Sequence, residues 1–216
     1  MQSAINTIIF DLGNVLIPWE PRWLFRQLLP DEAAIDRFMA DADFLAWNHL
    51  HDAGQPFALG ITQASERHPH YRHLFQAYFE RWDETVGDAY PESVACLREL
   101  KAAGLRVLAL TNFSSETFVR ARQRYAFLAE FEGIVVSGDE GLTKPDPAIY
   151  QRLFARYQVE PARALFIDDS AANINTARAL GLQAIHLAEP ARIRAQLRAH
   201  GLPVQEAATE GRAFKD

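Results

Sequence analysis

The sequence of 216 residues predicts an α/β protein, a doubly wound and largely parallel sheet that carries an inserted helical domain. Short apolar runs rich in β-branched and aromatic residues recur along the chain and are typical of buried strands. Helical patterns separate most of these runs, which is the alternation expected when helices connect parallel strands. One long interval, residues 18–86, holds helical patterns and no strand pattern, and it predicts the insertion.

The first element is a strand at residues 7–11 (TIIFD), which ends at an acid and is followed by Gly13. The interval after it is too long for a loop between a strand and a helix. Prolines and glycines divide it into five expected helices: 23–29, 32–39, 44–51, 57–67 and 71–82.

The domain division follows from this interval. We expect an α/β core domain made of residues 1–17 and 87–216, and a helical cap domain made of residues 18–86. The cleft between a cap and a sheet is a natural place for a ligand.

The rest of the core alternates between helices and strands. A helix is expected at 91–103, with Gly104 as its stop, and a strand at 105–110. The remaining elements follow in order: helix 116–125, strand 133–136, helix 147–157, strand 164–167, helix 171–180, strand 183–187 and helix 192–197.

Charge and composition narrow the function classes. The formal net charge is −6, so there is no overall positive field to hold nucleic acid. No apolar run reaches the length of about 20 residues that spans a bilayer. The first residues lack the features of a signal peptide, and the one cysteine, Cys96, cannot form an intrachain disulfide. A cytoplasmic protein with a small-molecule ligand is expected.

Chemically active side chains follow three of the predicted strands. Asp11 ends the first strand, Thr111 and Asn112 follow the strand at 105–110, and Asp168 and Asp169 follow the strand at 164–167. Ligands of parallel sheets bind beyond the carboxyl ends of the strands, so these groups should meet there. Lys144, in the loop before the helix at 147–157, adds a cation. Carboxylates suit Mg²⁺, and a cation with neutral donors suits a phosphoryl group.

Four motifs in order carry a resemblance to a known family. They are FDLGNVL (10–16), LTN (110–112), TKPDP (143–147) and FIDDSAAN (166–173). Together they make the chain similar to haloacid dehalogenase superfamily hydrolases, in the subgroup with a helical cap inserted after the first motif. The resemblance extends to about residue 187 and implies a Rossmann-like core.

The resemblance implies a role for each motif residue. Asp11 would be the nucleophile that forms an aspartyl-phosphate and would also ligate Mg²⁺, together with the backbone carbonyl of Gly13 and the side chain of Asp169. Asp168 would be a further ligand or lie just outside the ligand shell. Thr111 and the backbone of Asn112 would bind the phosphoryl oxygens. Lys144 would neutralise charge between the phosphoryl group and Asp11, and Asn173 would orient the metal-site carboxylates.

Gly13 departs from the usual pattern of the family's phosphatases, which place a second aspartate there as general acid and base. The sequence instead resembles a branch with Asp-x-Gly-Asn-Val, whose members include sugar-phosphate phosphatases such as glucose 1-phosphate phosphatases. General acid–base catalysis contributes about 10²–10⁴ in rate. We therefore expect a preference for esters with good leaving groups, unless Asp168 or a cap histidine donates the proton.

The leading interpretation is a Mg²⁺-dependent phosphatase for a small phosphorylated metabolite, such as a sugar phosphate. A 2-haloacid dehalogenase is the alternative enzyme, although in this family it would carry a bulky aromatic residue at position 13 and uncharged residues at 168 and 169. A catalytically silent binding domain is the other alternative, but it would not need a costly cluster of carboxylates beside Lys144. The substrate, the oligomeric state and transfer to an acceptor other than water stay open.

Overall fold

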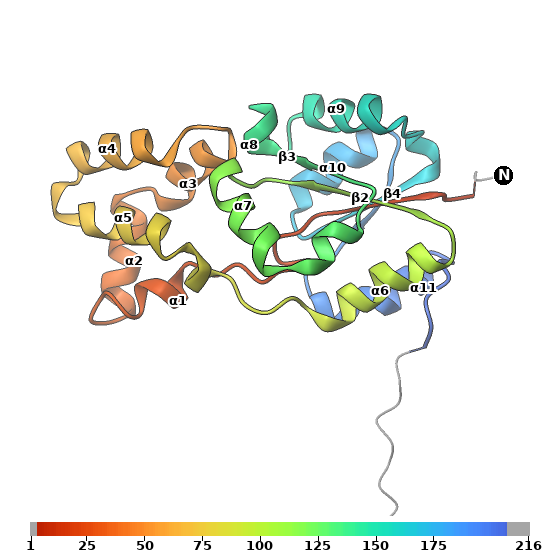
Figure 1. The fold of residues 1–216 in the computed structure, drawn as a ribbon, viewed down its shortest axis with the longest axis horizontal. Helices are drawn as coiled ribbons and strands as arrows, with labels where there is room; N and C mark the ends of the chain where they lie inside the picture. Colours follow the sequence, from red (N-terminus) through yellow and green to blue (C-terminus); the bar gives the residue numbers. More distant parts are fainter. Residues whose placement is uncertain (1–3, 207–216) are drawn as a thin grey trace, which may run out of the picture.

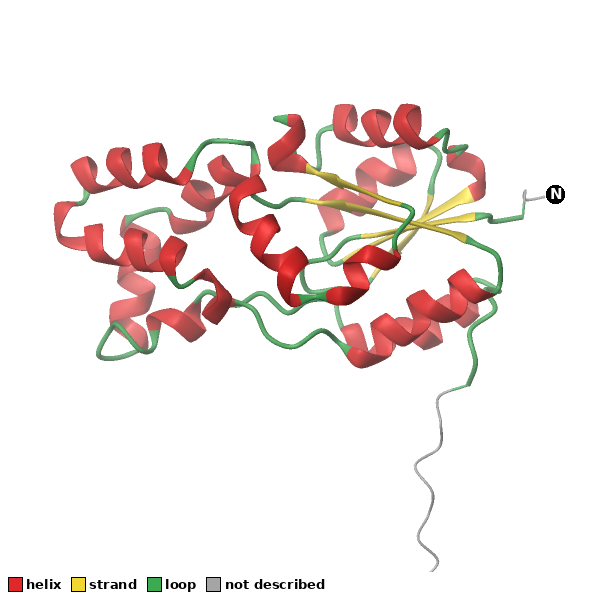
Figure 2. Ribbon diagram, viewed as in Figure 1, coloured by secondary structure: helices red, strands yellow, loops and turns green. Residues whose placement is uncertain are grey.

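A parallel sheet of five strands organises the core in a computed structural model that describes residues 4–206 (Figures 1 and 2). The order across the sheet is β3-β2-β1-β4-β5. The strands are β1 (Thr7–Phe10), β2 (Arg106–Thr111), β3 (Gly133–Val136), β4 (Ala164–Asp168) and β5 (Gln183–His186). Because β1 is central and pairs with both β2 and β4, the chain that leaves β1 emerges in the middle of the carboxyl edge.

Helices cover both faces of the sheet, which explains why the strands are continuous apolar runs. Ile9 packs on one face, while its neighbours Ile8 and Phe10 pack on the other. The Ile9 face is covered by α9 (Pro147–Tyr157) and α10 (Ala171–Ala179). The other face is covered by α6 (Pro91–Ala102), α7 (Ser115–Arg124) and α11 (Ile193–Ala199). The predicted fold class is confirmed.

The segment between β1 and α6 folds into a separate group of helices, at the left of Figure 1. They are α1 (Arg22–Phe25), α2 (Glu32–Asp41), α3 (Phe44–Asp52), α4 (Phe57–Arg67) and α5 (Arg72–Glu80), with the short helices η1 (Pro69–Tyr71) and η2 (Trp82–Thr85). Aromatic side chains form their interior: Phe25 and Phe44 lie 5.3 Å apart between ring centroids, and Trp47 and Phe75 lie 5.0 Å apart. We call this group the cap.

The chain enters and leaves the cap through two segments that lie side by side. Trp19 and Val86 form an antiparallel bridge. The amide of Glu20 donates to the carbonyl of Thr85 at 2.8 Å, and the amide of Gly87 donates to the carbonyl of Pro18 at 3.1 Å. This paired junction lies next to the domain limits expected at residues 17 and 86, which stay a prediction.

The structure differs from the sequence-based expectation in a few short elements. The helix expected at 23–29 is shorter, since only Arg22–Phe25 is helical, and Pro30 disfavours helical backbone in the residue before it. A one-turn helix, α8 (Ser137–Glu140), follows β3, and it was not predicted because so short a segment shows no apolar periodicity. The other short helices are η3 (Ala126–Glu130), η4 (Pro161–Arg163) and η5 (Pro190–Arg192). No helix within residues 4–206 is long and apolar enough to cross a membrane.

Candidate active site

The loop after β1 presents Asp11 at the centre of the carboxyl edge. The backbone amide of Asp11 continues the sheet by donating to the carbonyl of Ile167 at 2.8 Å. Its Oδ1 accepts from the amide of Leu12 at 2.7 Å and from Lys144 Nζ at 2.9 Å. Residues 4–206 provide no hydrogen bond to Oδ2, so one carboxylate oxygen is held while the other is free to react.

Lys144 is buried, with 2% of its surface exposed, and its ammonium has an acceptor for each of its three protons. Nζ donates to Asp168 Oδ2 at 2.7 Å, to the carbonyl of Leu110 at 2.9 Å and to Asp11 Oδ1. These contacts fix the cation between the ends of β1, β2 and β4. It is therefore placed to neutralise charge next to Asp11.

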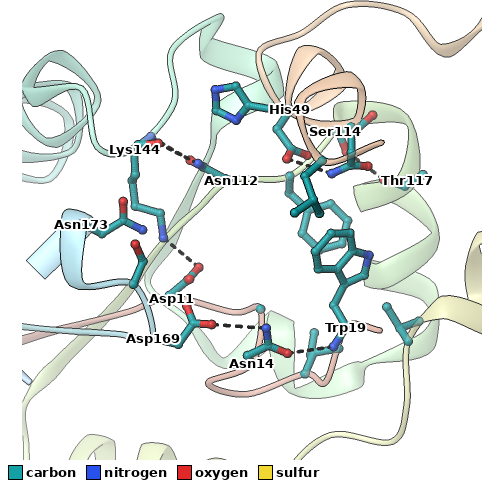
Figure 3. A pocket seen from close by; sticks show the side chains of 18 of the residues that line it. Asp11, Asn14, Trp19, His49, Asn112, Ser114, Thr117, Lys144, Asp169 and Asn173 are labelled. Carbon is teal, nitrogen blue, oxygen red and sulfur yellow. Dashed lines mark hydrogen bonds and ion pairs between the residues drawn. The ribbon is translucent and has the colours of Figure 1, made fainter. Parts of the chain in front are cut away.

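Asn112 holds the backbone of Lys144 on both sides. Its Nδ2 donates to the Lys144 carbonyl at 2.9 Å, and its Oδ1 accepts from the Lys144 amide at 2.8 Å (Figure 3). The side chain of Asn112 thus ties the loop that carries Lys144 to the end of β2. Its expected role in binding phosphoryl oxygens through the backbone stays a prediction.

Asp168 is fully buried and accepts hydrogen bonds at both oxygens. Asn173 Nδ2 donates to Oδ1 at 2.9 Å and to Oδ2 at 3.1 Å, and the amide of Ser170 donates to Oδ1 at 2.8 Å. With Lys144 at Oδ2, these donors offset the cost of a buried carboxylate. Asn173, in the first turn of α10, therefore orients Asp168. Its expected role in orienting metal-site carboxylates stays a prediction.

Asp169 faces the same space and is oriented by a residue that the sequence analysis gave no role. Asn14 Nδ2 donates to Asp169 Oδ2 at 3.2 Å, and Asn14 Oδ1 accepts from the amide of Trp19 at 3.1 Å (Figure 3). Asn14 has a φ of 53°, a left-handed conformation that asparagine tolerates better than most residues. The Asp-x-Gly-Asn motif indicates this position, because an asparagine in the tight loop after Asp11 can adopt the turn and also donate to Asp169.

Three carboxylates and one ammonium leave a net negative charge at this edge. One oxygen each from Asp11, Asp168 and Asp169 lie within 4.8 Å of one another. Burial raises the pKa of Asp11 to about 7, and the charges of Asp168 and Asp169 add to the rise while Lys144 opposes it. Burial acts to lower the pKa of Lys144, but the charges of Asp11 and Asp168 outweigh it and raise the pKa. Clustered oxygen donors with excess negative charge fit a divalent cation such as Mg²⁺.

Thr111 occupies the end of β2 but is not among the residues that line the cavity. Its hydroxyl is buried and has no hydrogen-bond partner within residues 4–206. A buried unpaired hydroxyl costs about 1–3 kcal/mol, so a ligand oxygen that reached it would be stabilised. The expected contact of Thr111 with a phosphoryl oxygen stays a prediction.

A cavity of about 450 Å³ opens above Asp11, Gly13, Lys144 and Asp169. The cap and the core both line it, and most of its wall was not predicted because sequence alone does not orient cap helices. Aromatic rings form one part of the wall: Trp19, Phe57, Tyr78, Trp82 and Phe113. Polar side chains form another part: Asn48, His49, Asp52, Ser114 and Thr117. Figure 3 shows Trp19 across the cavity from Asp11 and Lys144. His49 lies nearer the loop that carries Lys144, where its Nε2 is 3.2 Å from the hydroxyl of Thr143.

Comparisons with known proteins agree with this architecture. The family model described as haloacid dehalogenase-like hydrolase matches residues 5–181. The sesquiterpene phosphatase astK of Aspergillus oryzae is 27% identical over 200 residues, which cover 88% of this chain and 93% of the fungal protein. The (S)-2-haloacid dehalogenase 1 of Pseudomonas sp. (strain CBS-3) is 33% identical over 190 residues, with 87% and 78% covered. A phosphoglycolate phosphatase of Yersinia pseudotuberculosis is 28% identical over 196 residues, with 86% and 82% covered.

Solved structures show the same fold. A predicted hydrolase from Porphyromonas gingivalis superposes with a TM-score of 0.68 at 22% identity, covering 92% of this chain and 98% of that one. An enzyme from Bacteroides thetaiotaomicron, solved as a magnesium complex, superposes with a TM-score of 0.64 at 19% identity, with 85% and 93% covered. At these identities the likeness concerns the fold alone.

Proposed function

The chain belongs to the haloacid dehalogenase-like hydrolases, and on that premise we propose that it is a Mg²⁺-dependent phosphomonoesterase that acts through an aspartyl-phosphate on Asp11. The observation that carries the proposal is the carboxylate cluster around Lys144, whose three oxygens lie within 4.8 Å of one another. Phosphoryl transfer needs a nucleophile, a fixed cation and a metal site next to each other. Asp11, Lys144 and Asp169 would provide these parts.

The steps follow from the contacts of Asp11 and Lys144. The free Oδ2 of Asp11 would attack phosphorus, while the amide of Leu12 and Lys144 hold Oδ1 in place. The P–O bond to the leaving group breaks, and the phosphoryl group is then bonded to Asp11. Water attacks phosphorus in the second step, which frees the Asp11 carboxylate and inorganic phosphate. Lys144 keeps its charge throughout, because its ammonium is surrounded by acceptors.

Asp11, the backbone carbonyl of Gly13 and Asp169 would hold the metal. Both oxygens of Asp168 already accept hydrogen bonds, from Lys144 and from Asn173, so we propose that Asp168 positions Lys144 beside Asp11. When bound, Mg²⁺ would supply positive charge against the phosphoryl oxygens. The magnesium complex of the Bacteroides enzyme, which shares the fold, supports this choice of ion.

The cavity supports a small substrate with a partly apolar body. Aromatic rings and amide or hydroxyl groups share its wall, and its volume of about 450 Å³ lies in the range of small-molecule sites. The names of the relatives suggest sesquiterpenyl phosphates and phosphoglycolate as probes beside sugar phosphates. The proposed substrate class is therefore a small phosphate monoester.

A dehalogenase remains the second candidate, because the relative with 33% identity carries that name. Two features of the site speak against it. Gly13 contributes no side chain, where the dehalogenases of the family would place a bulky aromatic residue. The net negative charge of the site would also repel the carboxylate of a haloacid, whereas a phosphatase offsets that charge with a metal.

We expect phosphate release from at least one ester when Mg²⁺ is present, and a loss of about 10²-fold or more with excess chelator. The panel would contain glucose 1-phosphate, glucose 6-phosphate, 2-phosphoglycolate and a sesquiterpenyl phosphate, each assayed with Mg²⁺ and with chelator. Equal rates in chelator would contradict the metal. Chloride release from 2-chloropropionate without phosphate release from any ester would assign the chain to the dehalogenases.

Asp169→Ala should chiefly weaken Mg²⁺ binding, because it removes a carboxylate of the cluster. Asn14→Ala keeps the Asp169 carboxylate but removes the hydrogen bond that orients it, along with the hydrogen bond to the Trp19 amide, and should raise the Mg²⁺ concentration for half-maximal activity by about 10-fold. The rise for Asp169→Ala should be larger. Titration of activity with Mg²⁺ measures both, and unchanged titration curves would remove Asp169 from the metal site.

A further inference from the structure

The proposed reaction leaves open which group protonates the leaving oxygen. An alkoxide is a poor leaving group unless it receives a proton as the P–O bond breaks. In an in-line displacement the leaving oxygen lies on the side of phosphorus opposite Asp11. Gly13, in the loop after β1, offers no donor there because it has no side chain, and the space beside it is open, since a Cβ on it would meet no atom within 4 Å. The side-chain amide of Asn14 in the same loop donates to Asp169.

Several polar groups near the cavity are already committed to other contacts. All three protons of the Lys144 ammonium have acceptors, and Asp168 is fully buried among its donors. The hydroxyl of Tyr78 donates to Asn48 Oδ1 at 2.7 Å. The hydroxyl of Thr117 donates to the carbonyl of Ser114 at 3.4 Å. These contacts leave none of the four groups as a ready proton donor to the leaving oxygen.

Asp52, the last residue of α3, differs from them. It lines the same cavity as Asp11 and Lys144, on the cap side. Asn48 Nδ2 donates to Asp52 Oδ2 at 3.2 Å, and Tyr78 fixes the orientation of that amide through Asn48 Oδ1. The backbone amide of Ser114, at the start of α7, also donates to the Asp52 carboxyl group. Asp52 is thus held by the cap and by the core at once.

The surroundings of Asp52 favour a protonated carboxyl group. Burial raises its pKa to about 7, while the charge of Lys144 and the hydrogen bond from the Ser114 amide oppose the rise. An acid–base group works best when its pKa lies near the working pH. Near neutral pH, Asp52 can therefore give up a proton in one step and take one back in the next.

We propose that Asp52 is the general acid and base of this enzyme, supplied by the cap to the leaving side of the cavity. In the first step Asp11 bonds to phosphorus, the bond to the leaving oxygen breaks, and the Asp52 proton goes to that oxygen, giving an alcohol and an Asp52 carboxylate. In the second step water bonds to phosphorus, its proton goes to Asp52, and the bond from phosphorus to Asp11 breaks. The proposal rests on the proposed phosphomonoesterase activity.

The location of Asp52 couples the proton transfer to the position of the cap. The carboxyl group belongs to α3 of the cap, whereas Ser114 belongs to the core. The hydrogen bond between them exists only while the cap packs on the core in this arrangement. The acid would therefore be in place when the cap covers the substrate and would leave when the cap opens.

The test compares Asp52→Asn with the wild-type enzyme on two esters in the presence of Mg²⁺. The first, para-nitrophenyl phosphate, has a leaving group that departs without a proton, and the second, glycerol 3-phosphate, does not. We expect Asp52→Asn to lose about 10²–10⁴-fold in kcat on glycerol 3-phosphate and less than about 10-fold on para-nitrophenyl phosphate. Asp41→Asn is the matched control, since Asp41 ends α2 on the cap surface and contacts Tyr71, and it should match the wild type on both esters.

The outcomes separate this proposal from the proposed function. If the wild-type enzyme hydrolyses neither ester, the phosphatase assignment fails first. If the wild type is active and Asp52→Asn loses both esters equally or neither, the role of Asp52 as an acid is refuted while the phosphatase stands. A selective loss on glycerol 3-phosphate in His49→Gln, with Asp52→Asn unaffected, would also refute it and would assign the acid to His49, another titratable cap residue of the cavity.

Discussion

Asp11→Asn is expected to abolish phosphate release, by about 10⁴-fold or more in kcat, and to leave the fold intact. An amide has nearly the shape of a carboxylate but cannot act as the nucleophile that bonds to phosphorus. Its oxygen can still accept the hydrogen bonds from Leu12 and Lys144 that hold Oδ1 in the wild type. The loss should therefore be one of chemistry and not of structure.

The thermal midpoint separates these two causes. In chelator, Asp11→Asn should unfold at the same temperature as the wild type or at a higher one, because the substitution removes one of three crowded carboxylates. Para-nitrophenyl phosphate is the substrate of choice for the activity measurement, since it requires no proton donor. Turnover by Asp11→Asn at more than about a hundredth of the wild-type rate would exclude Asp11 as the nucleophile.

Lys144→Met is expected to remove both activity and a large part of the stability. The substitution leaves Asp11 and Asp168 buried without their shared cation, and breaking a buried ion pair on one side typically costs about 3–5 kcal/mol. Urea unfolding in chelator measures the free energy of unfolding. Lys101→Met is the control, because Lys101 lies on the exposed side of α6 and its loss should change stability by less than about 0.5 kcal/mol.

The double variant Lys144→Met with Asp168→Asn tells whether the stability loss is electrostatic. Removing the second charge should return part of the lost stability, since no uncompensated carboxylate then remains at position 168. Activity should stay absent, because the cation beside Asp11 is still missing. A single Lys144→Met variant as stable as the wild type would show that the two carboxylates do not depend on Lys144.

The sequence predicted the part of the site that depends on strand ends. Asp11, Asn112 and Asp168 each follow or end a parallel strand, so their meeting at one edge follows from the sheet itself. Lys144 was predictable from its motif, and the structure places its ammonium between Asp11 and Asp168. Thr111 was expected at the ligand but does not line the cavity.

The residues that the sequence analysis missed depend on side-chain orientation. Asn14 looked like a turn residue, and only the fold brings its amide to Asp169, which is 155 positions away. Asp52 lies in a cap helix whose aromatic side chains predict burial but not which side faces the core. The residues of the cap that line the cavity could therefore not be predicted from hydrophobic periodicity, because packing between distant segments decides which side of each helix faces the core.

The most direct test of the central claim is to find the phosphoryl group on Asp11 during turnover. The wild-type enzyme would be mixed with Mg²⁺ and para-nitrophenyl phosphate, quenched in acid within the turnover time, digested and analysed by mass spectrometry. The account predicts a phosphorylated peptide that contains Asp11, and no such peptide from Asp11→Asn. Rapid phosphate release with the phosphoryl group on another residue, or with no phosphorylated peptide at any quench time, would contradict it.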